Sequence, residues 1–184
     1  SLARLSAAGA VVQRGSLPAF DEILELSARR GTIVNAEAYS VHKERVEGEQ
    51  AHQIDHRVVR RIRAASSMTL VDYIAAMLAR QRILSQMTDE MAGRCLVAMP
   101  TVPETAPAIA DLEADDELFA RTNLKMLRNT MMGNYLGWCG LSFPNGTDAS
   151  GLPTAILLSG APGTDEQLLS LSMTAEKIIR DGDD

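Results

Sequence analysis

The sequence predicts a helix-rich domain of the α/β or α+β class. Three observations lead to this prediction. Apolar residues recur with helical spacing over most of the chain. Short continuous apolar runs of strand length interrupt them, and turns rich in Pro and Gly bound these runs. The predicted strands are too few to form a full, covered sheet by themselves.

The composition excludes several functions. The chain has 184 residues, of which 46% are hydrophobic and 23% charged, as in ordinary globular domains. A net charge of −6 and an aromatic content of 4% do not suit a protein that binds phosphate backbones or stacks on bases, so no nucleic-acid partner is expected. No run of about 20 apolar residues exists, so no membrane partner is expected. Two cysteines and the absence of a signal-peptide pattern favour a cytoplasmic location.

The first segment is predicted to run from a helix into a strand. Leu2, Leu5 and Ala8 have helical spacing, Gly9 closes that helix, and the apolar run Ala10–Val12 follows. A lone strand at this place has no partner nearby and is not stable in water. We therefore expect the chain to be cut from something longer.

Six further helices are predicted from apolar spacing and capping signals. They cover approximately residues 19–29, 32–46, 54–65, 70–93, 117–127 and 165–180. Pro18 suits the start of the first of these, and Thr69 caps the longest. Thr164 caps the last helix, where Gln167 completes a capping box.

Three further strands are predicted in the second half of the chain. Cys95–Met99 is continuously apolar, which predicts burial on both faces. Gly140–Phe143 and Thr154–Leu158 flank the segment Pro144–Pro153, which is rich in turn residues. The last two strands are therefore expected to form a hairpin.

Nucleophilic chemistry has no local motif in this sequence. There is no Gly-x-Ser-x-Gly elbow, and the adjacent pair Ser66 and Ser67 fits the gap between two helices. Lys43, Lys125 and Lys177 lie on predicted helices among other charges, where a solvated lysine is the ordinary interpretation. Motif chemistry alone therefore predicts an inert chain.

Metal, phosphate and thiol sites are also not predicted. His52 and His56 are four residues apart, but a zinc site needs a third well-placed ligand and only His42 remains. The glycines near the C-terminus fit turns rather than a phosphate-binding loop. Cys139 is interpreted as a buried small apolar residue.

An ordered set of segments runs through the chain from its start to near its end. The segments are Leu5–Val12, Glu37–His42, Val59–Ile62, Asp72–Ala76 with Arg80, Leu96–Pro103, Asn134–Pro144, Gly151–Gly160 and Pro162–Leu169. In this order they resemble the C-terminal part of amidase signature enzymes. The ordered set is specific, and the likeness covers nearly the whole chain.

The resemblance implies an α/β fold with a mixed β-sheet covered by helices. It implies that residues 1–184 are the C-terminal portion of a single amidase signature domain. The activity implied is hydrolysis of amide C–N bonds by a Ser–Ser–Lys triad, on a small-molecule amide and without metal or organic cofactor. In that family the triad lies in the N-terminal half, which we expect to be absent here, so the chain alone is expected to be inactive.

The resemblance also implies three residues of the substrate pocket. Arg61 matches an arginine that, in the glutamine-specific branch, helps to hold the substrate carboxylate, and a guanidinium suits this role because it binds both oxygens. Thr130 and Asn134 match a segment near the pocket. A structural ion pair remains open for Arg61, and packing or backbone hydrogen bonding for the other two.

The chain departs from the family pattern at three places. Leu127 stands where the glutamine-specific branch has an aspartate, so ammonia delivery from glutamine is not expected. The segment Gly137–Gly140 replaces the usual Gly-x-Pro-Ala and leaves the pocket shape open. Arg94 or Cys95 replaces the aspartate before the strand that ends in Pro-Thr.

A second class of function remains open, a non-catalytic helical module that acts as a scaffold or binding surface. The apolar runs Val11–Val12, Cys95–Met99 and Gly140–Leu158 argue against it, because they need partners that this chain barely supplies. If the chain stands alone, we expect exposed apolar edges and self-association into a homo-oligomer.

Overall fold

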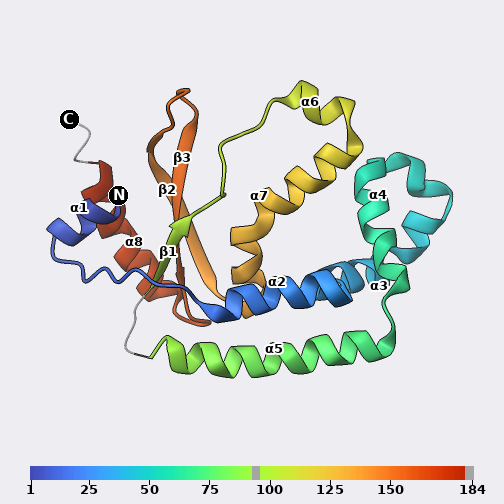
Figure 1. Ribbon diagram of the computed structural model, residues 1–184, viewed down its shortest axis with the longest axis horizontal. Coiled ribbons are helices and arrows are strands. Elements are labelled where there is room, and N and C mark those ends of the chain that lie inside the picture. Colours follow the sequence, from blue (N-terminus) through green and yellow to red (C-terminus); the bar gives the residue numbers. More distant parts are fainter. Residues whose placement is uncertain (93–95, 181–184) are drawn as a thin grey trace. The chain divides into compact units, whose positions relative to one another are not determined.

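The computed structural model describes residues 1–92 and 96–180 (Figure 1). The chain divides into two compact units, which we call the helical unit (Leu17–Met87) and the sheet unit (Ser1–Ser16 with Thr88–Asp184). Along the described chain, helices are long and numerous and strands are few. This confirms the predicted helix-rich α/β class.

The helical unit is built from helices and two short 3₁₀ turns. Its elements are α2 (Pro18–Arg30), α3 (Ile33–Glu47), η1 (Glu49–Gln53), α4 (His56–Arg63), η2 (Ala64–Ser67) and α5 (Leu70–Glu90). Val46 of α3 is fully buried, and Val59 and Ile62 of α4 pack against it. The predicted helices of this region are confirmed, although α5 ends at Glu90 and the predicted end near Gly93 lies outside the described residues.

Side-chain caps explain where three of these helices begin. The Asn35 N–H donates to the Thr32 hydroxyl at 3.1 Å at the start of α3. Asp55 caps α4 by accepting from its second residue. At α5 the Asp72 N–H donates to the Thr69 hydroxyl at 3.1 Å, which confirms the predicted cap. Each cap satisfies a backbone donor that the helix itself leaves without a partner.

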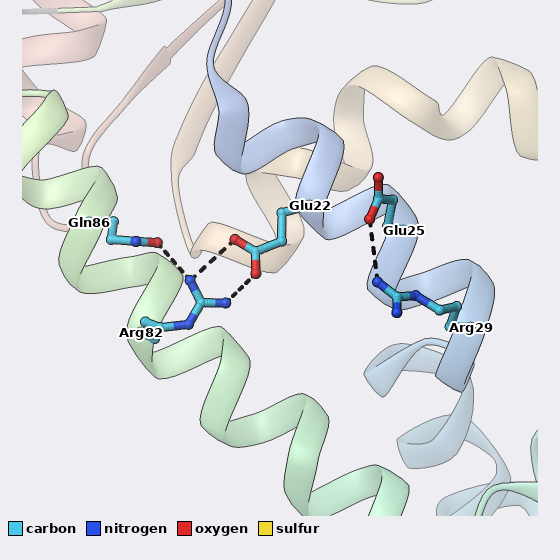
Figure 2. A network of polar contacts seen from close by, with 5 residues as sticks. All are labelled: Glu22, Glu25, Arg29, Arg82 and Gln86. Atoms are coloured by element: carbon cyan, nitrogen blue, oxygen red, sulfur yellow. Dashed lines mark hydrogen bonds and ion pairs between the residues drawn. The ribbon is translucent and has the colours of Figure 1, made fainter.

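Ion pairs join α2 to α5 at two places along the described helices. Arg82 of α5 contacts both carboxylate oxygens of Glu22 and also donates to Gln86 at 2.9 Å (Figure 2). Nearer the other end of both helices, Arg30 of α2 donates to Asp72 at 2.8 Å. The first half of α2 thus meets the second half of α5, so the two helices run antiparallel.

The described residues of the sheet unit form four helices and a three-stranded antiparallel sheet. Its elements are α1 (Leu2–Ala7), β1 (Val97–Pro100), α6 (Ile109–Ala114), α7 (Asp116–Leu136), β2 (Cys139–Thr147), β3 (Pro153–Gly160) and α8 (Asp165–Arg180). The strand order is β1-β3-β2, so β3 is central and pairs with both neighbours. The predicted hairpin of the last two strands is confirmed. Both pairings among the described residues are antiparallel, so these strands do not include the parallel pair of a mixed sheet.

One face of the sheet packs against α8 and α1 (Figure 1). Directly opposed residues point to the same face, and Leu141 opposes Leu158 while Phe143 opposes Ile156. These four side chains join apolar residues of the two helices in one buried cluster. Its buried members are Leu5, Phe143, Ile156, Leu158, Leu168, Ala175 and Ile179.

The predicted strand Ala10–Val12 is wrong. The segment has no regular structure, and the side chain of Val11 is 89% exposed. A strand needs a hydrogen-bonded neighbour, and none of the three described strands pairs with this segment.

The prediction that the strand at Cys95–Met99 is buried on both faces is also wrong. The strand itself exists as β1, although Cys95 lies outside the described residues. Burial alternates along β1 because the strand lies at the edge of the described sheet with β3 as its one partner there. The central strand β3 is the buried one, with five consecutive buried residues from Ile156 to Gly160.

Helix α7 is longer than the predicted 117–127, because apolar spacing continues to Leu136, which is fully buried. The helix ends at Gly137, whose φ of 67° lies in the left-handed region that favours glycine. Gly137, the first residue of the segment Gly137–Gly140 that departs from the family pattern, is therefore explained by its role in ending the helix.

The last helix begins at Asp165, as predicted, and Thr164 precedes it. The predicted capping box differs in detail, because the Thr164 hydroxyl donates to the Ala161 carbonyl oxygen at 2.8 Å. Cys139 is partly rather than fully buried, and its Sγ lies 3.5 Å from both the Ala161 oxygen and the Thr164 hydroxyl.

Large apolar side chains are exposed in both units. On α5 the residues Leu70, Ile74 and Leu78 are 73%, 49% and 61% exposed, and their spacing places them on one face of the helix. Within the described residues no single helix is long and apolar enough to span a membrane. The segments His56–Ser67 and Leu70–Glu90 reach that length and apolar content only when taken together, and a bend of 97° separates them.

Candidate functional site

The three predicted pocket residues fall on two helices. Arg61 lies on α4 in the helical unit, whereas Thr130 and Asn134 lie on α7 in the sheet unit. The residues on α7 are one helical turn apart and so share a face of that helix.

Arg61 is positioned by the burial of the opposite side of α4. Val59 and Ile62 lie in the core of the helical unit and fix the rotation of the short helix. The Arg61 side chain is exposed, and within residues 1–92 and 96–180 no ion pair involves its guanidinium. The structural ion pair that the sequence left open is therefore not formed by the described residues. The guanidinium is available to bind an anion such as a carboxylate.

Thr130 and Asn134 differ in what their side chains do. The Thr130 hydroxyl donates to the Leu127 carbonyl oxygen at 3.2 Å, so it forms the backbone hydrogen bond that the sequence left open. Asn134 is exposed, and an exposed amide offers both a donor and an acceptor to a ligand.

Sequence reasoning missed the residues that anchor α7 to the sheet. Asn129 donates from Nδ2 to the Pro100 carbonyl oxygen at 2.8 Å, at the end of β1. Lys125, one turn earlier, pairs with Glu104 in the segment that follows β1. These contacts fix the position of the α7 face that presents Thr130. A long-range side-chain contact of this kind leaves no pattern in the sequence.

A pair of hydroxyl groups lies on the face of the sheet away from the α8 cluster. Ser142 of β2 and Thr101, which follows β1, have their oxygens 2.6 Å apart. The alternation of Gly140 and Ser142 with apolar residues in β2 was a usable signal, because alternate residues of a strand face opposite sides. The pairing of Ser142 with Thr101 required knowledge of the strand order.

The serine pair and two of the lysines occupy ordinary structural positions. Ser67 donates from its hydroxyl to the Ala64 carbonyl oxygen at 3.2 Å within η2. Lys125 forms the ion pair just described, and the Lys43 ammonium lies 5.9 Å from the centre of the Tyr39 ring. In the described part of the chain, no group of three or more His, Cys, Asp and Glu side chains is arranged to hold a metal ion.

One carboxylate ties the hairpin to the segment after β1. The pKa of Asp148 is lowered, first by a hydrogen bond from the Thr105 side chain and then by backbone N–H groups. The N–H groups of Ser150 and Leu152 donate to its Oδ1 at 2.8 and 2.9 Å. The charged form of Asp148 therefore organises the turn of the hairpin.

The family model for amidases matches residues 1–169. The chain belongs to the amidase family. Among curated relatives of this family, the 2-amino-5-chloromuconic acid deaminase of Comamonas testosteroni is 30% identical over 97% of this chain. The mandelamide hydrolase of Pseudomonas putida is 36% identical over 45% of the chain.

Solved structures of two hydrolases share the fold. An alanine variant of Kluyveromyces lactis allophanate hydrolase matches with a TM-score of 0.79 at 21% identity over 97% of this chain. A 6-aminohexanoate cyclic dimer hydrolase with bound substrate matches with a TM-score of 0.73 at 21% identity over 96% of this chain. The 184-residue chain covers 38% of the deaminase, 28% of the allophanate hydrolase chain and 39% of the cyclic dimer hydrolase chain.

Proposed function

We propose that these residues form the C-terminal portion of an amide hydrolase whose Ser–Ser–Lys triad lies in sequence outside them. The observation that carries the proposal is the amidase match over residues 1–169, in a chain that covers 38% of its deaminase relative. The proposed reaction consumes one water and converts an amide into a carboxylic acid and an amine. A serine that is activated by a neighbouring base would form the acyl intermediate.

The local chemistry of the chain supports a role as pocket wall. A nucleophilic serine needs a base within hydrogen-bonding reach, and the Ser67 hydroxyl instead donates to a backbone carbonyl. A lysine base needs a desolvated site, and Lys125 is about half exposed in its ion pair with Glu104. We therefore assign no catalytic residue to the chain and expect it to be inactive when produced alone.

We propose further that Arg61 of the helical unit binds a carboxylate of the substrate. Thr130 and Asn134 of the sheet unit are proposed separately as substrate-binding residues. The exposed guanidinium supports the role of Arg61 because it binds both oxygens of a carboxylate. The deaminase relative supports it as well, since its name specifies an acid as its substrate. The proposed substrate class is thus a small amide that carries a carboxylate.

The test of the hydrolase proposal is an assay of the full-length protein against paired amides, each with and without a carboxylate. Release of amine or ammonia is measured, together with labelling by a fluorophosphonate that reacts with activated serines. We expect both in the full-length protein and neither in residues 1–184 alone. A full-length protein that shows neither would favour the non-catalytic module instead.

A variant tests the role of Arg61. Because a hydrogen-bonded charge pair is lost, Arg61→Gln should raise KM for a carboxylate-bearing amide roughly tenfold to hundredfold. It should leave the neutral partner amide nearly unchanged, and Arg61→Lys should fall between because it keeps the charge without the fork. Michaelis–Menten kinetics on both amides measure this. An equal loss on both amides would show that Arg61 acts through the structure instead.

A further inference from the structure

Val58 is the apolar residue of α4 that does not belong to the core of the helical unit. The other two apolar residues of this helix, Val59 and Ile62, are buried and pack with Val46 in that core. The side chain of Val58 is 37% exposed and lies outside this described cluster. A single exposed apolar side chain is common in proteins, so its neighbours decide what it can bind.

Val58 and Arg61 are neighbours on one side of α4. Residues three positions apart in an α-helix differ by about 60° around the axis, and their Cβ atoms lie roughly 5–6 Å apart. The Cα–Cβ bond of a helical residue tilts toward the N-terminus, so the stem of Arg61 is directed toward the turn that contains Val58. The methylene groups of this stem and the Val58 side chain therefore form an apolar surface next to a guanidinium.

The Arg61 guanidinium is the group on this side of α4 that can bind an anion. The Arg61 side chain is exposed, and no ion pair within residues 1–92 and 96–180 involves it. Arg57, one turn earlier, is half-buried and already has an interaction partner. Its backbone N–H donates to Asp55 Oδ1 at 2.8 Å, which engages the carboxylate of Asp55 at the start of the helix. A ligand carboxylate on this side of the helix is therefore expected on Arg61.

The combination of a guanidinium with an apolar neighbour selects among carboxylates. The guanidinium binds both oxygens of any carboxylate and so does not distinguish one from another. The Val58 side chain offers no hydrogen bond, so a polar group placed against it would lose its water without gaining a partner. A hydrocarbon segment in the same place is favoured, because its apolar surface and that of Val58 are removed from water together.

We infer that Val58 determines the specificity of the Arg61 site, and that the part of the substrate next to its carboxylate is a hydrocarbon segment. The inference rests on the proposed function, in which Arg61 binds a substrate carboxylate, and adds the chemistry of the adjoining part. A substrate with a polar group on the carbon that carries the carboxylate is disfavoured at this site.

The test is a calorimetric titration of the full-length protein with three monocarboxylates. Hexanoate carries a hydrocarbon chain, 2-hydroxyhexanoate adds a hydroxyl group beside the carboxylate of the same chain, and acetate has only a methyl group. We expect saturable binding of hexanoate, with acetate about tenfold weaker and 2-hydroxyhexanoate at least about threefold weaker. The absence of saturable hexanoate binding, or equal binding of all three compounds, would overturn the inference.

A variant locates the contact at Val58. Val58→Thr keeps the side-chain volume nearly unchanged and adds a hydroxyl, so the preference for hexanoate over 2-hydroxyhexanoate should fall about threefold. Val41→Thr is the matched control, because Val41 is 75% exposed on α3, and it should change this preference less than about twofold. Circular dichroism checks the fold of both variants. An unchanged preference in Val58→Thr, or an equal change in both variants, would overturn the inference.

Arg61→Gln tests whether hexanoate binds at the proposed place. Hexanoate binding should weaken about tenfold or more, because the charge-assisted hydrogen bonds to the carboxylate are lost. Binding that persists in Arg61→Gln would place hexanoate elsewhere and overturn the inference.

The titrations require no reaction and therefore separate this inference from the proposed function. A full-length protein that releases amine from amides but fails these titrations would overturn the inference and leave the hydrolase proposal standing. A protein that shows the expected binding without amine release or fluorophosphonate labelling would overturn the hydrolase proposal and support the specificity of the Arg61 site.

Discussion

Asp72 is stabilised in its charged form by two side chains. The Thr69 hydroxyl donates to it at 2.6 Å and the Arg30 guanidinium at 2.8 Å. The Thr69 hydrogen bond is the largest cause of the lowered pKa of Asp72, and Arg30 lowers it further while desolvation acts in the opposite direction. One carboxylate therefore links the start of α5 to the end of α2.

The lowered pKa of Asp72 predicts how a variant depends on pH. A depressed pKa in the folded state stabilises the protein above the unfolded pKa of about 4, and this stability is lost as the pH falls through the folded value. Asp72→Asn should therefore be less stable than the parent protein at pH 7, and the difference should shrink below about pH 4. Urea unfolding of both proteins at pH 7 and pH 3 measures this.

Glu25→Gln is the matched control for Asp72→Asn. Glu25 pairs with Arg29 within α2 at 3.4 Å, and both side chains are mostly exposed (Figure 2). Such a pair contributes little to stability, so its loss should change the urea midpoint less at pH 7. A difference between Asp72→Asn and the parent that is the same at both pH values would contradict the electrostatic explanation.

At the scale of elements, the antiparallel pairing of α2 and α5 is held by oppositely arranged charges. Glu22 on α2 meets Arg82 on α5, while Arg30 on α2 meets Asp72 on α5. A parallel arrangement would bring Glu22 toward Asp72 and Arg30 toward Arg82, which are like charges. The pairs therefore favour the antiparallel orientation of the two helices, although each pair contributes little to the free energy of unfolding.

A double-mutant cycle tests the coupling of Glu22 and Arg82. Glu22→Gln and Arg82→Gln should each destabilise the protein slightly, with a coupling of about 0.2–1 kcal/mol because both side chains are partly exposed. Urea unfolding at low and high salt measures the coupling, which salt should reduce. A coupling of zero at low salt would contradict the contact.

The sequence predicted local features of these elements well and long-range pairings poorly. Thr69 was predicted as a cap because capping depends on residues within one turn. The edge position of β1 was not predicted, because it depends on β3, a strand much later in the chain. At the candidate site, the role of Arg61 was inferred from the resemblance to amidase signature enzymes and stays a prediction, whereas the anchoring of α7 by Asn129 required the position of Pro100 in space.

At the scale of the whole molecule, exposed apolar surface predicts self-association of the 184-residue chain. Leu70, Ile74 and Leu78 form a stripe on α5 whose side chains are 73%, 49% and 61% exposed. Burial of such side chains stabilises an assembly by roughly 25 cal/mol per Å² of apolar area. We expect the isolated chain to form oligomers and to bind the dye ANS, as measured by light scattering after gel filtration and by fluorescence.

Variants on the α5 stripe test the source of this association. Leu70→Gln combined with Leu78→Gln should reduce oligomer formation and dye binding, because both side chains are more than half exposed. Val46→Ala serves as a contrast, since it weakens the buried core and should increase dye binding instead. A monomeric parent chain that melts cooperatively would contradict the prediction and would also count against the proposal that the chain is part of a larger domain.

The central position of β3 has a consequence for the order in which the protein is made. During synthesis β1 leaves the ribosome first, followed by all of α6, α7 and β2, and β3 follows only after them. β1 therefore remains without β3, its partner in the described sheet, until α6, α7 and β2 have been synthesised. Pro100 ends β1 and lacks a backbone N–H, so the strand offers one donor fewer to a wrong partner in that interval.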